Sequence, residues 1–232
     1  MTEEQWLKLT DVEEFLRPLY DYTVCAHDET LEWIRPFLSR SSSRKLRLFS
    51  VGYCRWLERV GLMNASIMHA IDAVEHDIDV GNKASRKRMQ RVRKSLITGE
   101  SLTSSRYRPI VCALTGSNAV RMSFGTLCYC RNLFQEGSDL DRNARDAQVR
   151  LLCDIFGNPF SSVSFQSSWR SPKAVTLAEN MYRSGDFGGL PNLAYLLEES
   201  GCNDPILLNH CQESHVFHIR GCWVVDAVLG YV

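Results

Sequence analysis

The sequence predicts a mainly α protein, a compact multi-helix bundle with at most a few short strands. Three observations lead to this prediction. Apolar residues recur three and four positions apart through most of the chain, which is the spacing of one helix face. Residues that cap helix starts precede many of these stripes, and glycine or proline follows them. The chain has 232 residues, of which 44% are hydrophobic and 23% charged, so it can bury a substantial core.

Two capping-box spacings stand at the beginning of the chain. Thr2 precedes Gln5 and Thr10 precedes Glu13 by three residues, so each threonine can accept from a free backbone N–H while the later side chain reaches back. Helices are therefore expected over 3–8 and 11–19, and a third over 29–38. Longer apolar stripes predict helices over 44–60 and, capped by Asn64, over 65–80, which end at Gly61 and Gly81.

The polar stretch 98–109, rich in serine and threonine, is the best candidate for a linker. It would divide the chain into N-terminal (1–98) and C-terminal (109–232) helical regions, with one compact domain as the alternative. Further along, helices are expected over 117–135, 139–156, 171–185, 191–201, 204–212 and 222–229. Short strands are expected at 161–166 and 215–219.

Composition excludes several classes of protein. Lys plus Arg and Asp plus Glu both number 27, so no net charge attracts nucleic acid or anionic lipid. No apolar run has the roughly 20 residues of a membrane helix, and the start lacks the features of a secretory signal. A cytoplasmic protein without membrane contact is expected. Its nine cysteines form no C-x-x-C pair and mostly have apolar neighbours, which predicts reduced, buried thiols.

The basic segment, residues 83–94, carries seven positive charges without an acidic residue. A helix is predicted here, over about 82–96. Like charges on one helix repel, so the segment needs a counter-surface. The favoured surface is the acidic run at 72–79; nucleic acid or a partner protein is the alternative. The tentative binding residues are Lys83, Arg86, Lys87, Arg88, Arg91, Arg93 and Lys94.

The stretch NHCQESHVFHIRGCW holds the densest group of metal-ligand types in the chain. Cys211, His215, His218 and Cys222 have the ligand types of tetrahedral zinc, and they form a minority hypothesis for a metal site. Ordinary packing is the favoured interpretation, with His210 bonding the end of its own helix. A third alternative pairs a cysteine nucleophile with a histidine base from this stretch.

The strings RKLRLFSVGYCR, LLCDIFGNPF, LPNLAYLLEESGCNDPILLNHC and HIRGCWVVDAVLG, with the opening MTEEQWLKLTD, carry a resemblance. Together they resemble an uncharacterised family of small proteins abundant in planctomycete bacteria. The resemblance covers the start and the last third of the chain. It implies a bacterial cytosolic protein with a mainly helical fold, and it implies no activity and no catalytic residue.

The function follows by elimination. Phosphate loops, dinucleotide-binding glycine motifs and nucleophile elbows are all missing from the sequence, so an enzyme is not favoured. The leading expectation is a non-catalytic bacterial cytosolic protein that binds another protein. The alternatives are a nucleic-acid-associated protein that uses the basic segment, and a zinc-stabilised domain or Cys/His enzyme that uses residues 210–222.

Overall fold

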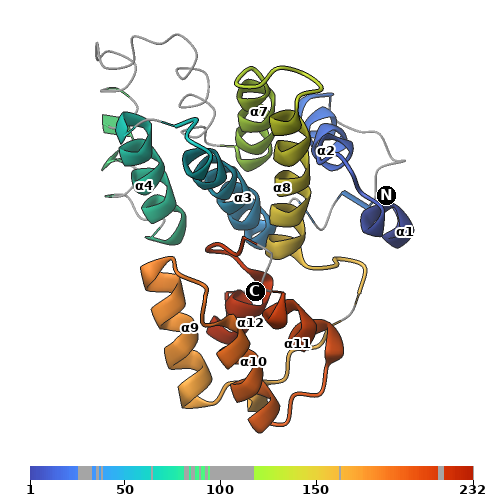
Figure 1. The fold of residues 1–232 in the computed structure, drawn as a ribbon, viewed down its shortest axis with the longest axis vertical. Helices are drawn as coiled ribbons and strands as arrows, with labels where there is room; N and C mark the ends of the chain where they lie inside the picture. Colours follow the sequence, from blue (N-terminus) through green and yellow to red (C-terminus); the bar gives the residue numbers. More distant parts are fainter. Residues whose placement is uncertain are drawn as a thin grey trace. The chain divides into compact units, whose positions relative to one another are not determined.

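The chain divides into two compact units, and the boundary falls within one helix (Figure 1). Unit 1 comprises Met1 and Leu9–Val149, and unit 2 comprises Thr2–Lys8 and Arg150–Val232. The structure is a computed structural model that describes residues 1–25, 33–34, 37, 39–63, 65–80, 84, 87–88, 90–91, 94, 118–161, 163–213 and 217–231. The predicted linker at 98–109 lies outside the described residues, so the division into 1–98 and 109–232 stays a prediction.

Helices dominate both units, which confirms the mainly α prediction. The helices of unit 1 are α2 (Glu13–Cys25), α3 (Arg40–Arg59), α4 (Ala65–Val80), α7 (Ala119–Arg131) and the first part of α8 (Asp139–Phe156). Those of unit 2 are α1 (Glu3–Leu7), the end of α8, the short 3₁₀ helix η3 (Ser167–Trp169), α9 (Pro172–Ser184), α10 (Leu190–Glu199), α11 (Pro205–Gln212) and α12 (Trp223–Leu229).

In unit 1, α3 packs against α4 and α7, and α7 packs against α2. The helix faces predicted to be apolar supply the core, since Phe15, Leu46, Tyr53 and Ile71 are all fully buried. Burying a side chain of this size contributes about 1.5–3 kcal/mol relative to exposure. The stripes that the sequence placed on these helices therefore hold the unit together.

Two helix starts in unit 1 differ from the prediction. The N–H of Glu13 donates to the Asp11 carboxylate at 2.8 Å, so α2 begins at Glu13 with Asp11, rather than Thr10, as the capping side chain. The helix also continues through Pro18 to Cys25, where the sequence ended it at 19. Packing against α7 favours the longer helix, and the Tyr20 ring stacks on Phe124 at 4.6 Å. Ser39 caps α3, which begins at Arg40, four residues before the predicted start at 44.

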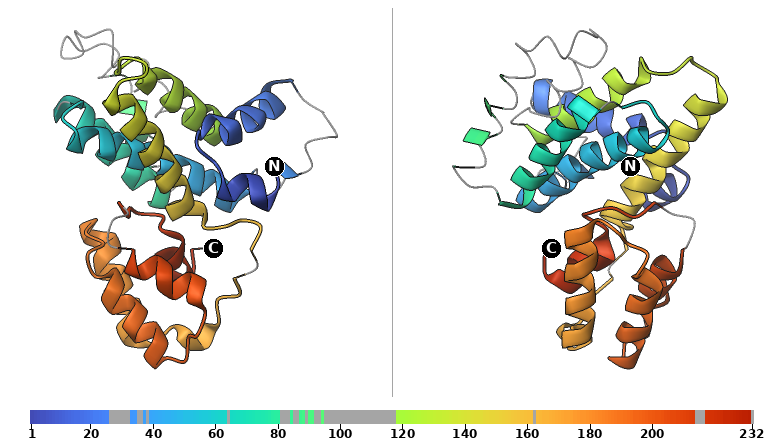
Figure 2. Two further views of the ribbon diagram at one scale, coloured as in Figure 1. Left: turned by 45° about the vertical axis from the view of Figure 1, so that its right-hand side comes forward. Right: turned by 60° about the vertical axis from the view of Figure 1, so that its left-hand side comes forward.

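Unit 2 follows the predicted helix boundaries more closely. The Ser171 hydroxyl accepts from the Ala174 N–H, and the Asp204 carboxylate accepts from two N–H groups at the start of α11. Gly185 ends α9 in the left-handed conformation that glycine adopts without steric cost. Helices α9 to α12 pack side by side, α9 on α10 and α12 and α11 on α10 and α12 (Figure 2).

The predicted short strands are wrong where the structure describes them. Residues 163–166 are irregular and lead into η3, and residues 217–219 form no strand. A strand needs a hydrogen-bonded neighbour, and the described parts of these two segments have none in a ladder. Side-chain packing orders the first segment instead, because the Phe165 ring contacts Trp169 edge-on at 5.4 Å.

Across the described helices, none has both the length and the apolar character that crossing a bilayer requires.

Candidate metal centre

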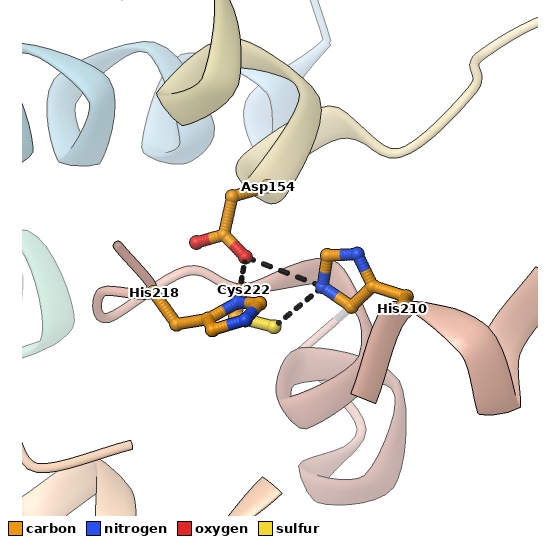
Figure 3. A group of neighbouring side chains, drawn as sticks. All are labelled: Asp154, His210, His218 and Cys222. Atoms are coloured by element: carbon orange, nitrogen blue, oxygen red, sulfur yellow. Dashed lines mark hydrogen bonds and ion pairs between the residues drawn. The ribbon is translucent and has the colours of Figure 1, made fainter. Parts of the chain in front are cut away.

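Four side chains with metal-binding atoms converge within unit 2 (Figure 3). Asp154 lies in the last turn of α8 and His210 in the last turn of α11. His218 lies in the connection between α11 and α12, and Cys222 directly precedes α12. One ligand atom from each residue lies within 4.8 Å of all the others. We call these four residues the ligand cluster.

The distances within the ligand cluster approach those around one ion. The Nε2 atom of His210 lies 3.2 Å from Cys222 Sγ and 3.2 Å from Asp154 Oδ1. The Nδ1 atom of His218 lies 2.7 Å from the same Asp154 oxygen. Tetrahedral zinc bonds imply ligand–ligand separations of roughly 3.3–3.6 Å. Movements on the order of 1 Å would therefore bring all four atoms into a tetrahedral coordination sphere.

Backbone groups orient two of the ligands. The Ile219 N–H donates to Asp154 Oδ2 at 3.2 Å, which leaves Oδ1 facing the histidines. The Nε2 atom of His218 lies 3.3 Å from the Glu213 carbonyl oxygen. Because a carbonyl can only accept, Nε2 carries a proton, and Nδ1 is the ring nitrogen that faces the cluster, where it donates to Asp154 as long as no metal ion replaces its proton. Such outer contacts commonly fix the tautomer and rotamer of metal ligands.

The ligand cluster is buried. The side chains of Asp154 and His218 are 0% and 7% exposed, and that of His210 is 12% exposed. Burial favours a neutral Asp154, but hydrogen bonds from both histidines outweigh it and place its pKa below the usual range. Burial and the Asp154 charge raise the pKa of the Cys222 thiol well above its ordinary value. A buried carboxylate of this kind requires compensating positive charge.

The geometry distinguishes metal binding from cysteine–histidine catalysis. In a nucleophilic triad, the histidine uses one ring nitrogen for the thiol and the other for the carboxylate. Here a single nitrogen, His210 Nε2, faces both Cys222 and Asp154. The buried thiol with a raised pKa is also a poor nucleophile. Convergence of all donor atoms on one point is the arrangement that a metal ion requires.

The predicted ligand set is brought together in part. His218 and Cys222 belong to the ligand cluster. Cys211 is buried in the apolar core of unit 2 and is not one of the four, and His215 lies outside the described residues. Asp154 and His210 complete the cluster, and the Nε2 atom of His210 faces Asp154 and Cys222.

A sequence signal for Asp154 existed. The residue lies three positions after Leu151 and directly before Ile155, both fully buried members of the apolar stripe of α8. An acidic residue within a buried stripe needs a partner, and this requirement marks it as a candidate.

The basic segment is described in part. Lys87, Arg88, Arg91 and Lys94 are helical and exposed, whereas Lys83, Arg86 and Arg93 lie outside the described residues. Three residues of the acidic run of α4 pair with arginines of α3. Arg55 contacts Asp72 and Glu75, and Arg44 lies 3.3 Å from Asp79. Contact of the basic segment with α4, and the alternative of nucleic-acid binding, remain predictions.

The cysteines follow the expectation where the structure describes them. Cys54, Cys130, Cys202, Cys211 and Cys222 are free and buried, and Cys128 and Cys153 are free and half-buried. Apolar surroundings thus account for these thiols, and Cys222 differs from the others by its histidine contact.

Comparisons of the chain with known protein families, curated proteins and solved structures find no match. The resemblance to the planctomycete family therefore stays a prediction.

Proposed function

We propose that unit 2 binds one zinc ion through the ligand cluster, and that this ion stabilises a non-catalytic protein. The single observation that carries the proposal is the convergence of one carboxylate, two imidazoles and one thiol within 4.8 Å in a buried part of the unit. This combines two of the functions expected from the sequence, the non-catalytic protein and the zinc-stabilised domain.

The donor atoms favour zinc over the hard cations. Ca²⁺ and Mg²⁺ take mainly oxygen ligands, whereas one sulfur and two nitrogens suit Zn²⁺ and its spectroscopic substitute Co²⁺. A bound cation would also lower the pKa of Cys222 and convert the thiol to the thiolate ligand.

The burial of the ligands favours a structural role. Four protein ligands complete a tetrahedral sphere and leave no position for a substrate, whereas catalytic zinc keeps one position open. The ion would join the end of α8 to α11 and to the segment before α12. Protein binding as the biological role of the stabilised fold stays a prediction, and capture of a specific partner from the host tests it.

Elemental analysis of the full chain tests the proposal. Protein stripped with a chelator, reloaded with Zn²⁺ and freed of excess metal should retain about one zinc per chain. Cys222→Ala should lose stoichiometric zinc. Cys211→Ala is the matched control, because Cys211 is also buried in unit 2 but lies outside the ligand cluster.

Two outcomes would contradict the proposal. Absence of retained zinc in the folded wild-type chain would remove the metal centre altogether. Loss of zinc in Cys211→Ala and in His215→Ala, with retention in Asp154→Asn, would instead support the ligand set predicted from the sequence.

A further inference from the structure

The Trp223 ring contacts His210 of the ligand cluster and also the end of α8, the helix that carries Asp154. Trp223 follows Cys222 in the chain, and its ring lies against the His210 ring with a centroid distance of 5.3 Å and an interplanar angle of 52°. The same ring lies against Gly157, the residue directly after α8. Asp154 precedes Gly157 by about one helical turn, so the ring connects the end of α8, which carries Asp154, with α11, which carries His210.

Gly157 has two properties that a larger residue would lose. Its φ of +63° lies in the left-handed region, where L side chains are strained. A Cβ atom at this position would also lie 3.2 Å from the Cγ and Cδ2 atoms of Trp223. This separation is tighter than ordinary van der Waals contact, so the ring would have to move. The absence of a side chain therefore permits the close approach of α8 to Trp223.

We propose that Gly157 and Trp223 are positioning residues for the metal centre. The inference rests on the zinc site proposed above and deepens it, because it names the contact that sets the spacing of the ligands. Trp223 acts on Cys222 through the adjoining backbone and on His210 through the ring contact. Gly157 sets how closely the end of α8, and with it Asp154, approaches that ring.

The test compares two glycine substitutions in the full chain. Gly157→Ala introduces both backbone strain and the contact with Trp223. Gly185→Ala is the matched control, because Gly185 also follows a helix of unit 2 with φ +73° but has open space where its Cβ would lie. The two variants share the strain, and the contact with the ring distinguishes them.

Zinc affinity and the Co²⁺ spectrum are the readouts. Competition with a chromophoric chelator should show zinc affinity about tenfold weaker in Gly157→Ala, in the range typical of lost outer contacts at metal sites. Gly185→Ala should stay within about twofold of wild type. The visible Co²⁺ bands depend on coordination geometry, so they should shift in Gly157→Ala and not in the control. A change in fold stability alone would leave these bands in place.

A double-mutant cycle separates the ring from the backbone. Gly157→Ala placed in a Trp223→Leu background should weaken zinc binding less than it does in the wild type, because the clashing ring is absent. Equal effects of Gly157→Ala and Gly185→Ala on affinity and Co²⁺ bands would overturn the inference while wild-type binding upheld the zinc site. Wild-type protein that binds neither Zn²⁺ nor Co²⁺ would overturn both.

Discussion

Different kinds of polar interaction stabilise the two ends of α8. In unit 1, Arg145 of α8 lies 3.0 Å from Asp11, and Arg131 of α7 lies 2.9 Å from the same carboxylate. These side chains keep 22–36% of their surface exposed. In unit 2, the Asp154 side chain is completely buried against two histidines and a thiol. One helix thus begins among solvated ion pairs and ends in a buried polar cluster.

The contribution of a charged group to stability depends on how far it is buried. Partly exposed ion pairs contribute about 0–1 kcal/mol each, because water solvates the separated charges almost as well. A buried carboxylate costs several kcal/mol in lost solvation and is stable only with a complete set of partners. We therefore expect the apolar core to dominate the stability of unit 1, and the ligand cluster with the proposed zinc ion to control that of unit 2.

Removal of zinc should have the largest effect, and it should be confined to unit 2. With free zinc about 10,000 times above its Kd, linkage contributes about 5.5 kcal/mol to the free energy of unfolding. Hydrogen exchange read by mass spectrometry should show faster exchange in peptides from α9 to α12 after chelation. Peptides from α3 and α7 should be unchanged, and returning zinc should restore unit 2. Equal losses of protection in both units would contradict a stabilising effect of zinc that is confined to unit 2.

Truncation in the core of unit 1 should come next. Phe15 is fully buried and contacts Phe37 edge-on at 4.9 Å, so Phe15→Ala should cost about 3–5 kcal/mol through lost burial and a new cavity. Hydrogen exchange should place the loss in unit 1, with zinc content unaltered. A loss below about 1 kcal/mol would mean that apolar burial does not dominate this unit.

In the metal-free protein, the stability of the two units should depend differently on pH. Partial burial opposes the charged form of Glu13, but Arg17 and Arg131 outweigh it and lower the Glu13 pKa, and the Gly137 N–H and Arg145 lower that of Asp141. Lowered carboxylate pKa values give stability that is present above the ordinary value near 4 and lost as pH falls through the folded value. Unit 1 should therefore weaken at acidic pH.

Unit 2 should lose stability at both acidic and alkaline pH. Asp154 contributes the same acidic limit, since its folded pKa is lowered. Burial opposes the charged form of His218, but Asp154 outweighs it and raises the His218 pKa. That contribution is complete below the ordinary value near 6.5 and is lost as pH rises through the folded value. Chemical unfolding from pH 3 to 9 measures this, and His218→Gln should abolish the loss on the alkaline side.

Removal of one ion pair should have the smallest effect. Arg131→Met breaks contacts with Asp11 and Glu13 and should cost on the order of 1 kcal/mol or less. Arg142→Met is the control, because Arg142 pairs with Asp139 where both side chains are mostly exposed, and its effect should be near zero. Urea unfolding measures both. A loss of several kcal/mol in Arg131→Met would show that the ion pairs of unit 1 matter as much as its core.

The helices were predictable because their signals are local. The Ser171 and Asp204 caps bond N–H groups two or three residues away, and Gly185 needs only its own conformation to end α9. The predicted start of α2 was wrong although its signal is also local, since Asp11 and its neighbour Thr10 are both capping residues. The passage of α2 through Pro18 depends on packing against α7, which lies far away in the sequence.

The helical class, most helix boundaries and two of the four residues of the ligand cluster were predictable from the sequence alone. His218 and Cys222 stand close together in a stretch of ligand types, so their chemistry was visible in the sequence. Asp154 lies 64 residues before His218, and only tertiary structure brings their side chains to 2.7 Å. Local sequence patterns cannot predict this contact, because it depends on how α8, α11 and α12 pack. That packing is the sum of many weak apolar contacts.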